Sequence, residues 1–183
     1  MFFLINKPIG ISSFGAIARL RKILGIKKVG HTGTLDPLAS GLLLVATGNS
    51  TKLISYIDKA RKTYIFTVRL DGTTASLDLD TPVQFLDQVV LDRIGKTLTI
   101  KDIEKIIADD FSGVIEQIPP AYSAIRIDGE RAYKLIREGK EVVMKARRVE
   151  IFSSRVVSFD FPEVTIEMEV SAGTYIRSIA RDL

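Results

Sequence analysis

The chain has 183 residues, of which 46% are hydrophobic and 26% are charged, so it is long enough to bury a core and too apolar to be disordered. The absence of cysteine excludes a disulfide framework and cysteine-based zinc sites, and no apolar run approaches the ~20 residues of a membrane-spanning helix. Residues 1–62 hold ten Lys or Arg and two acids, a charge of +8, whereas the remainder carries −4. This asymmetry indicates either a polyanionic partner, most simply nucleic acid, or a solvated basic face.

Two elements are predicted at the start of the chain. Residues 1–13 have no basic region before their apolar run and no small-residue cleavage site, so we expect a buried strand and not a signal peptide. Residues 12–25 predict a helix that Ser12 or Ser13 caps and Gly25 ends, because apolar residues recur there at helical spacing.

The next elements are two strands and the helix between them. Residues 41–48 predict a short buried strand, and residues 49–60 predict a helix with Asn49 or Ser50 at its cap. Residues 62–72 alternate between apolar and polar positions, which is typical of a strand with one buried face. The apolar positions on that face are Tyr64, Phe66, Val68 and Leu70.

The middle of the chain predicts two helices around a proline-containing segment. Residues 99–111 begin with Thr99 and Asp102 at the spacing of a capping box and continue with an isoleucine stripe. Residues 118–129 contain two prolines and then a short strand, and residues 130–139 predict a short helix.

The last elements complete an α+β pattern. Residues 146–173 predict two strands joined near Pro162, and residues 173–183 predict a helix that no residue stops before Leu183. We therefore expect the natural protein to be longer. Strands and helices mix without regular βαβ alternation, so we predict an α+β fold with a largely antiparallel or mixed central sheet flanked by helices.

The stretch "GHTGTLDPLASG", residues 30–41, holds the only histidine, His31, and the only acidic residue among the first 57, Asp36. Its glycines indicate a loop whose backbone approaches another group closely or takes unusual dihedral angles. Pro37 biases Asp36 away from helical geometry, and spacing alone leaves open an Asp-Pro turn without chemistry. The chain contains neither a phosphate-binding G-x-x-x-x-G-K-[ST] loop nor a G-x-S-x-G nucleophile motif.

At this point the sequence resembles a known family. "GHTGTLDPLASGLLLVATGNSTKLISYI" is similar to the catalytic motif of the TruB family of pseudouridine synthases. Four further stretches resemble motifs of that family in the same order: "NKPIGISS", "KTYIFTVRL", "QIPPAYSAIRIDGERAYKLIREGK" and "SAGTYIRSIARDL". Five ordered motifs are far more specific than any single one, and they imply the pseudouridine synthase fold.

The resemblance implies a role for each matching residue. Asp36 corresponds to the catalytic aspartate, Tyr64 to a tyrosine that stacks on the target base and takes part in the reaction, and Arg177 to an arginine that pairs with the carboxylate. His31 corresponds to a histidine associated with displacing the target nucleotide. Substrate contacts are expected from Lys7, His31, Gly33, Thr34 and Tyr175.

The family isomerises uridine to pseudouridine at position 55 in the T-loop of tRNA, and it uses no cofactor or metal. The resemblance thus implies a cytoplasmic tRNA-modifying enzyme, which we expect to be a monomer. A flipped base needs an aromatic or apolar surface, and an enclosed carboxylate needs a cation to stay ionised, so Tyr64 and Arg177 suit these roles. Candidate contacts to the RNA backbone are Arg19, Arg21, Lys22, Lys27 and Lys28.

The sequence departs from the family pattern in three positions and in length. Asp71 stands where a glycine is usual, Ala75 where an acid is common, and Arg126 where a lysine is usual. We expect residues 1–183 to form one catalytic domain that is incomplete at its C-terminus and lacks the family's usual C-terminal RNA-binding domain.

Several alternatives remain open. One is the guide-RNA-dependent relative that modifies ribosomal RNA, and another is a non-catalytic RNA-binding or tRNA-folding protein. A third is a fragment without activity of its own. The sequence also leaves open whether Asp36 attacks the base, attacks the ribose or removes a proton from the ribose C2′.

Overall fold

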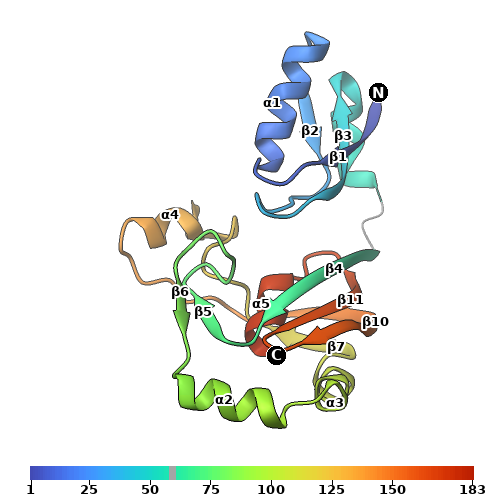
Figure 1. The fold of residues 1–183 in the computed structure, drawn as a ribbon. Helices are drawn as coiled ribbons and strands as arrows, with labels where there is room; N and C mark the ends of the chain where they lie inside the picture. Colours follow the sequence, from blue (N-terminus) through green and yellow to red (C-terminus); the bar gives the residue numbers. More distant parts are fainter. Residues whose placement is uncertain (58–60) are drawn as a thin grey trace. The chain divides into compact units, whose positions relative to one another are not determined.

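The computed structural model describes residues 1–57 and 61–183. The chain divides into two compact units, Met1–Lys59 and Ala60–Leu183 (Figure 1). Each unit has its own cluster of buried hydrophobic side chains, so each is described in turn.

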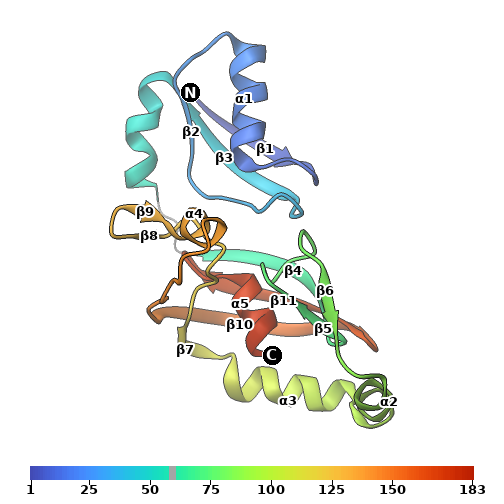
Figure 2. The ribbon, with the colours of Figure 1, turned by 90° about the vertical axis from the view of Figure 1, so that its left-hand side faces the viewer.

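The first unit is a three-stranded antiparallel sheet covered on one face by a helix. The strands follow the order β1-β3-β2, and Figure 2 shows the helix along one side of them. Buried side chains from the helix and from β2 and β3 form the core between the two layers. The elements are β1 (Phe2–Lys7), α1 (Ser13–Leu24), β2 (Val29–His31) and β3 (Gly41–Thr47).

Both predicted ends of helix α1 are confirmed. The Ser12 side chain accepts a hydrogen bond from the Gly15 amide, which satisfies one of the donors left open at a helix start. Gly25 ends the helix in the left-handed conformation, with φ of 64°, which a glycine adopts without a steric penalty.

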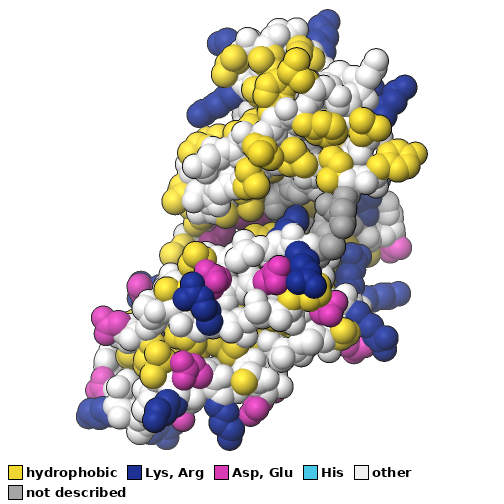
Figure 3. Space-filling model, turned by 90° about the vertical axis from the view of Figure 1, so that its right-hand side faces the viewer, with side chains coloured by type: hydrophobic (Ala, Val, Ile, Leu, Met, Phe, Trp, Pro, Cys, Tyr) yellow, Lys and Arg dark blue, Asp and Glu magenta, His cyan; other side chains and the backbone are white. Residues whose placement is uncertain are grey.

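The expectation of a buried first strand is only partly correct. Strand β1 forms over Phe2–Lys7, but Phe2 and Leu4 are 41% and 71% exposed. Successive side chains of a strand point to opposite faces, and α1 covers only one face of this sheet. The view of the first unit in Figure 3 accordingly shows many hydrophobic side chains at the surface.

The predicted helix after β3 is a 3₁₀-helix, η1 (Gly48–Tyr56), and its expected cap is wrong. Thr47 occupies the capping position, so the helix starts at Gly48, before Asn49 and Ser50. The Thr47 side chain makes no cap hydrogen bond. The Thr51 hydroxyl donates to the Gly48 carbonyl at 2.8 Å, within the first turn of this helix. The last residues of the predicted range, 58–60, lie outside the described residues.

The second unit is built on a four-stranded antiparallel sheet in the order β4-β11-β10-β7. Helices α3 and α5 contribute buried side chains to the same core as one face of β4, β10 and β11. The elements are β4 (Arg61–Arg69), α3 (Ile100–Asp110), β7 (Gly113–Gln117), β10 (Arg147–Asp160), β11 (Glu163–Ser171) and α5 (Ile176–Asp182).

The opposite face of this sheet is polar and carries ion pairs. Arg155 bonds Glu167 through two nitrogens at 2.9 and 3.0 Å, and Arg61 lies 3.5 Å from Glu169. Figure 3 shows basic and acidic side chains interspersed on the surface of the second unit.

The remaining elements are short, with one exception. Helix α2 was not predicted from the sequence, although Asp87 caps it by accepting a hydrogen bond from the Val89 amide. The remaining elements of the second unit are β5 (Gly72–Thr74), β6 (Val83–Phe85), α2 (Gln88–Thr97), β8 (Arg126–Ile127), β9 (Glu130–Arg131) and α4 (Ala132–Arg137).

The main predictions for the second unit are confirmed. Tyr64, Phe66 and Val68 share the core face of β4, and the capping box of Thr99 and Asp102 is formed in both directions. All strand pairs in the described part of the chain are antiparallel, in agreement with the predicted α+β class. In the same residues, no helix is long and apolar enough to cross a membrane.

The core of the second unit can be tested at Ile166, which is fully buried opposite Phe66. We expect Ile166→Ala to lower the free energy of unfolding by about 2–5 kcal/mol, because it removes apolar packing and leaves a cavity. Ile65→Ala is the matched control, since Ile65 is 65% exposed on the neighbouring strand, and it should cost about 1 kcal/mol or less. Urea unfolding measures both values, and equal costs would contradict the assigned core.

Candidate active site

Asp36 lies in the loop between β2 and β3, and its backbone neighbours are held on both sides. The hydroxyl of buried Ser13 donates to the Leu35 carbonyl at 3.0 Å and accepts from the Leu35 amide at 2.9 Å. The Pro37 carbonyl accepts from the Gly10 amide at 2.8 Å. The loop is therefore tied to the first residue of α1 and to the segment that joins β1 to α1.

A turn begins at Asp36 itself. The Asp36 carbonyl accepts from the Ala39 amide at 3.1 Å, and Pro37 takes the second position of the turn, which its fixed φ favours. The Asp-Pro turn that spacing allowed is thus present, and it presents a half-buried aspartate side chain. The turn and a chemical role for Asp36 are compatible.

Lys7 ends β1 and is fully buried beside this loop. Its ammonium donates to the carbonyls of Ile11 at 2.7 Å, Pro8 at 3.0 Å and Pro37 at 3.4 Å, so all three of its donors have backbone partners. Burial lowers the pKa of the Lys7 ammonium, and the nearby Asp36 carboxylate opposes that change. The expected contact of Lys7 with substrate stays a prediction.

His31 ends β2 at the start of the same loop. Its Nδ1 donates to the Gly33 carbonyl, because a carbonyl can only accept, and this bond orients the half-buried ring. Gly33 is half-buried and Thr34 is exposed. The predicted unusual backbone is confirmed at Gly41, whose φ of 126° favours glycine at the loop's end.

Tyr64 and Arg177 belong to the second unit. Tyr64 lies on β4 opposite Met168 and is half-buried against the core. Arg177 lies in the first turn of α5, where its Nη1 donates to the carbonyls of Ser76 at 2.9 Å and Tyr122 at 3.1 Å. Arg177 thus ties α5 to two loops of its unit.

Helix α5 is positioned by a buried side chain that the sequence did not single out. Gln117 accepts from the Tyr175 amide at 2.8 Å and donates to the Tyr175 carbonyl at 3.1 Å. Tyr175 occupies the capping position of α5, two residues before Arg177. The Ser178 hydroxyl donates to the Ile118 carbonyl at 2.8 Å and adds a second attachment.

The expected RNA-backbone residues differ in their freedom to contact a ligand. Arg19, Lys22, Lys27 and Lys28 are exposed on α1 or just after it. Arg21 is half-buried, donates to the Val29 carbonyl at 3.1 Å and lies 5.7 Å over the Phe14 ring.

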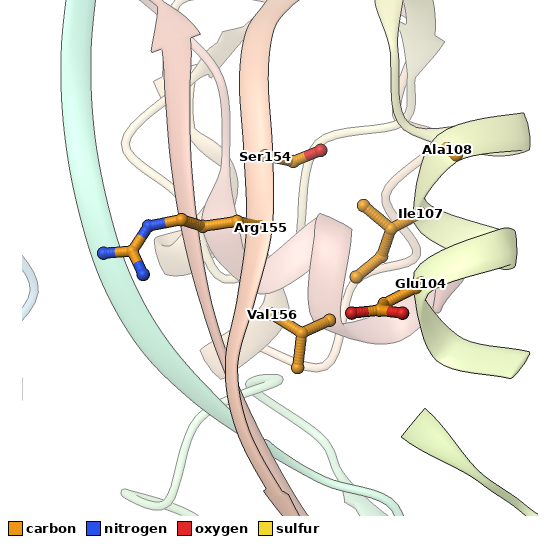
Figure 4. Close-up of a pocket in the computed structure, with 6 residues that line it drawn as sticks. All are labelled: Glu104, Ile107, Ala108, Ser154, Arg155 and Val156. Atoms are coloured by element: carbon orange, nitrogen blue, oxygen red, sulfur yellow. The ribbon is translucent and has the colours of Figure 1, made fainter. Parts of the chain in front are cut away.

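Two cavities of the second unit are lined by residues other than the expected catalytic, substrate and RNA-backbone residues. One, of about 240 Å³, is formed by α3 and β10, and Figure 4 shows the Arg155 guanidinium pointing away from the others that line it. Another, of about 350 Å³, lies between β8 and residues 143–147. In residues 1–57 and 61–183, no three His, Asp or Glu side chains are grouped so that they could hold a metal ion.

Asp71, which replaces a usual glycine, forms an ion pair with Arg69. The hydrogen bond from Arg69 holds the pKa of the nearly buried Asp71 carboxyl below its usual range, although burial opposes this shift. Asp71 also accepts a hydrogen bond from the Leu86 amide at its carbonyl. The replacement therefore adds a side-chain ion pair just after the end of β4. Ala75 and Arg126, the other two departures, are exposed.

The Asp71 pair predicts a dependence of stability on pH. Because the folded-state pKa is lowered, the pair stabilises the fold above the unfolded-state pKa of about 3.9, and this contribution is lost as the pH falls further. We expect the urea midpoint of Asp71→Asn to be lower than that of the wild type at pH 7. The difference between the two midpoints should narrow below about pH 4. The difference in midpoint between Arg69→Gln and the wild type should narrow in the same way. A difference that stays constant with pH would contradict the ion pair.

The sequence of this chain matches a known protein family and is similar to proteins of several bacteria. Residues 21–176 match the family described as TruB family pseudouridylate synthase (N terminal domain). The tRNA pseudouridine synthase B of Clostridium kluyveri is 41% identical over 180 residues, which are 98% of this chain and 59% of that protein. Its counterpart in Trichormus variabilis is 41% identical over 185 aligned positions, which cover 100% of this chain and 60% of that protein.

The fold has a counterpart among solved structures. A chain in the crystal structure of a Cbf5-Nop10-Gar1 complex superposes with a TM-score of 0.70 and 26% identity, over 99% of this chain and 42% of that chain. The α+β architecture is therefore the pseudouridine synthase fold. The chain belongs to the TruB family of pseudouridylate synthases, and it spans about three fifths of the length of these two relatives.

Several of the sequence-based expectations stay predictions. They include one catalytic domain over residues 1–183, the catalytic roles of Asp36, Tyr64 and Arg177, and the expected contacts to substrate and to the RNA backbone. Asp36, Lys7, His31, Gly33 and Thr34 lie in the first unit, whereas Tyr64, Tyr175 and Arg177 lie in the second.

Proposed function

We propose that this chain converts uridine to pseudouridine at position 55 in the T-loop of tRNA. The observation that carries the proposal is the 41% identity, over 98% of the chain, to a relative named tRNA pseudouridine synthase B. The anchored loop around Asp36 supports it further, because a catalytic carboxylate has to be held in a fixed place.

The proposed reaction breaks the bond between uracil N1 and the ribose C1′, rotates the base and joins C5 to C1′. The C5 proton is lost and N1 gains one, so the product is an isomer and no cofactor or metal is consumed. The residues accommodate three roles for Asp36: attack on the base, attack on the ribose, or removal of a proton from C2′. Each role needs an ionised carboxylate.

Tyr64 and Arg177 supply what such a carboxylate and its target base need. A uridine has to leave its stack to be reached, and the half-buried Tyr64 ring offers a surface for the flipped base. A guanidinium beside a carboxylate favours the ionised form of that carboxylate, and Arg177 offers such a group.

The partner in this proposal is the T-arm of tRNA, which a protein recognises largely through its backbone and shape. The exposed side chains of Arg19, Lys22, Lys27 and Lys28 suit contacts to phosphates. Action on tRNA by a monomer in the cytoplasm is part of the proposal.

The first test is a mass-spectrometric assay for pseudouridine in a T-arm oligonucleotide. We expect the wild type to form pseudouridine and Asp36→Asn to slow its formation by at least about 10³-fold, as removal of a catalytic nucleophile does. Asp109→Asn, on the exposed side of α3, is the matched control and should act like the wild type. A fully active Asp36→Asn variant would refute the catalytic role.

The second test concerns the RNA-binding lysines. Removing a side chain that neutralises one phosphate reduces the slope of log affinity against log salt concentration by about 1. We expect Lys27→Ala and Lys28→Ala each to reduce the slope for T-arm RNA by about that amount, and Lys101→Ala, in the second unit, to leave it unchanged. Fluorescence anisotropy over a salt series measures the slopes, and three equal slopes would exclude these lysines as phosphate ligands.

A guide-RNA-dependent enzyme is the second candidate function. The superposition on a chain from a Cbf5-Nop10-Gar1 complex, at 26% identity, shows that a chain of this fold also occurs within a larger complex, as this candidate would require. The higher identity to the tRNA pseudouridine synthase B relatives favours the first candidate. Pseudouridine formation in a bare T-arm oligonucleotide, with no other RNA present, would support the tRNA enzyme. Strict dependence on a second RNA would support the guide-RNA-dependent enzyme.

A further inference from the structure

Ser13 holds both backbone polar atoms of the residue that precedes Asp36. Its Oγ donates to the Leu35 carbonyl at 3.0 Å and accepts from the Leu35 amide at 2.9 Å. A hydroxyl has one proton and two lone pairs, so one serine can make both bonds at once. Ser13 is only 2% exposed, which shields both bonds from water.

The residue that follows Asp36 is held in the same way. Pro37 has no amide proton, so its carbonyl is its only backbone polar atom. That carbonyl accepts from the Gly10 amide at 2.8 Å and from the Lys7 ammonium at 3.4 Å. Every backbone donor and acceptor of the two residues that flank Asp36 therefore bonds to the segment 7–13.

Ser13 connects this loop to a rigid element. It is the first residue of α1, whose Ala16 and Ile17 are buried in the core of the first unit. Ser12 caps the helix, so the Ser13 hydroxyl is not needed for that task and is committed to Leu35. A shift of α1 or loss of the hydroxyl would release the backbone beside Asp36 on one side.

We propose that Ser13 is a positioning residue for the Asp36 carboxylate, acting through the Leu35 backbone. The inference rests on the proposed function, in which Asp36 is catalytic. A displacement of about 1 Å at a reacting group can cost about 10²-fold in rate, so loss of the Ser13 hydroxyl acts on the chemical step. The proposed contacts to the RNA backbone lie later on α1 or just after it and not in this loop, so we expect RNA binding to change less than the chemical step.

The test compares three variants of the full chain with the wild type. Ser13→Ala removes both hydrogen bonds, and Ser13→Thr keeps a hydroxyl at the same place. Thr47→Val is the matched control, because Thr47 is 4% exposed in the same unit and its hydroxyl bonds to the Met1 carbonyl, away from the loop.

Two readouts separate positioning from a general loss of stability. Hydrogen exchange by NMR should show the Leu35 amide protected in the wild type and exchanging at least about tenfold faster in Ser13→Ala, with core amides unchanged. In the pseudouridine assay, Ser13→Ala should lower kcat about 10²-fold with KM for the T-arm RNA within about twofold, and Ser13→Thr should recover most of the loss. Thr47→Val should match the wild type in both.

Unchanged Leu35 protection in Ser13→Ala, or faster exchange with a wild-type kcat, would overturn the positioning role. Absence of pseudouridine formation by the wild type would refute the proposed function instead. In that case the exchange rate of the Leu35 amide decides the anchoring alone: faster exchange in Ser13→Ala upholds it, and an unchanged rate overturns it.

Discussion

The hydrogen bonds between segment 7–13 and the Asp36 loop are the constraint on which the first unit's candidate site depends. A loop rich in glycine has many accessible conformations, and ordering it has an entropic cost. Here the backbone on either side of Asp36 is bonded to Ser13, the first residue of α1, and to Gly10, between β1 and α1. The only acidic residue among the first 57 is thereby presented from a defined turn within a strongly basic part of the chain.

The second unit uses the same device for a different element. Gln117 bonds both backbone polar atoms of Tyr175, as Ser13 does for Leu35, and this places the start of α5. Arg177 then reaches the carbonyls of Ser76 and Tyr122 from the first turn of that helix. In both units, a buried polar side chain with two satisfied hydrogen bonds sets the position of a residue that the proposed chemistry needs.

Much of the fold could be predicted from the sequence because its signals are local. The capping box at Thr99, the cap and glycine stop of α1, and the alternation around Tyr64 depend on residues within one element, and the structure confirms them. The predicted cap of η1 was wrong because a polar residue after a strand does not determine where a helix starts. The burial of β1 was overestimated because one helix covers only one face of its sheet.

The bonds that position the candidate site could not be read from local signals. Ser13 and Leu35 are 22 residues apart, and Gln117 and Tyr175 are 58 residues apart. A lone serine or glutamine gives no sign of such a partner in one sequence, although both lie within stretches that resemble family motifs. The resemblance thus indicated which segments matter, and the structure added which of their side chains hold the backbone.

The central claim is that the Asp36 carboxylate acts on a uridine of the T-loop, and a structure of the chain bound to a T-arm RNA tests this proposal most directly. We predict one T-loop uridine turned out of its stack, with the Asp36 carboxylate about 3–3.5 Å from an atom of its base or ribose. A bound RNA whose uridines all remain stacked, with Asp36 contacting none of them, would contradict the claim.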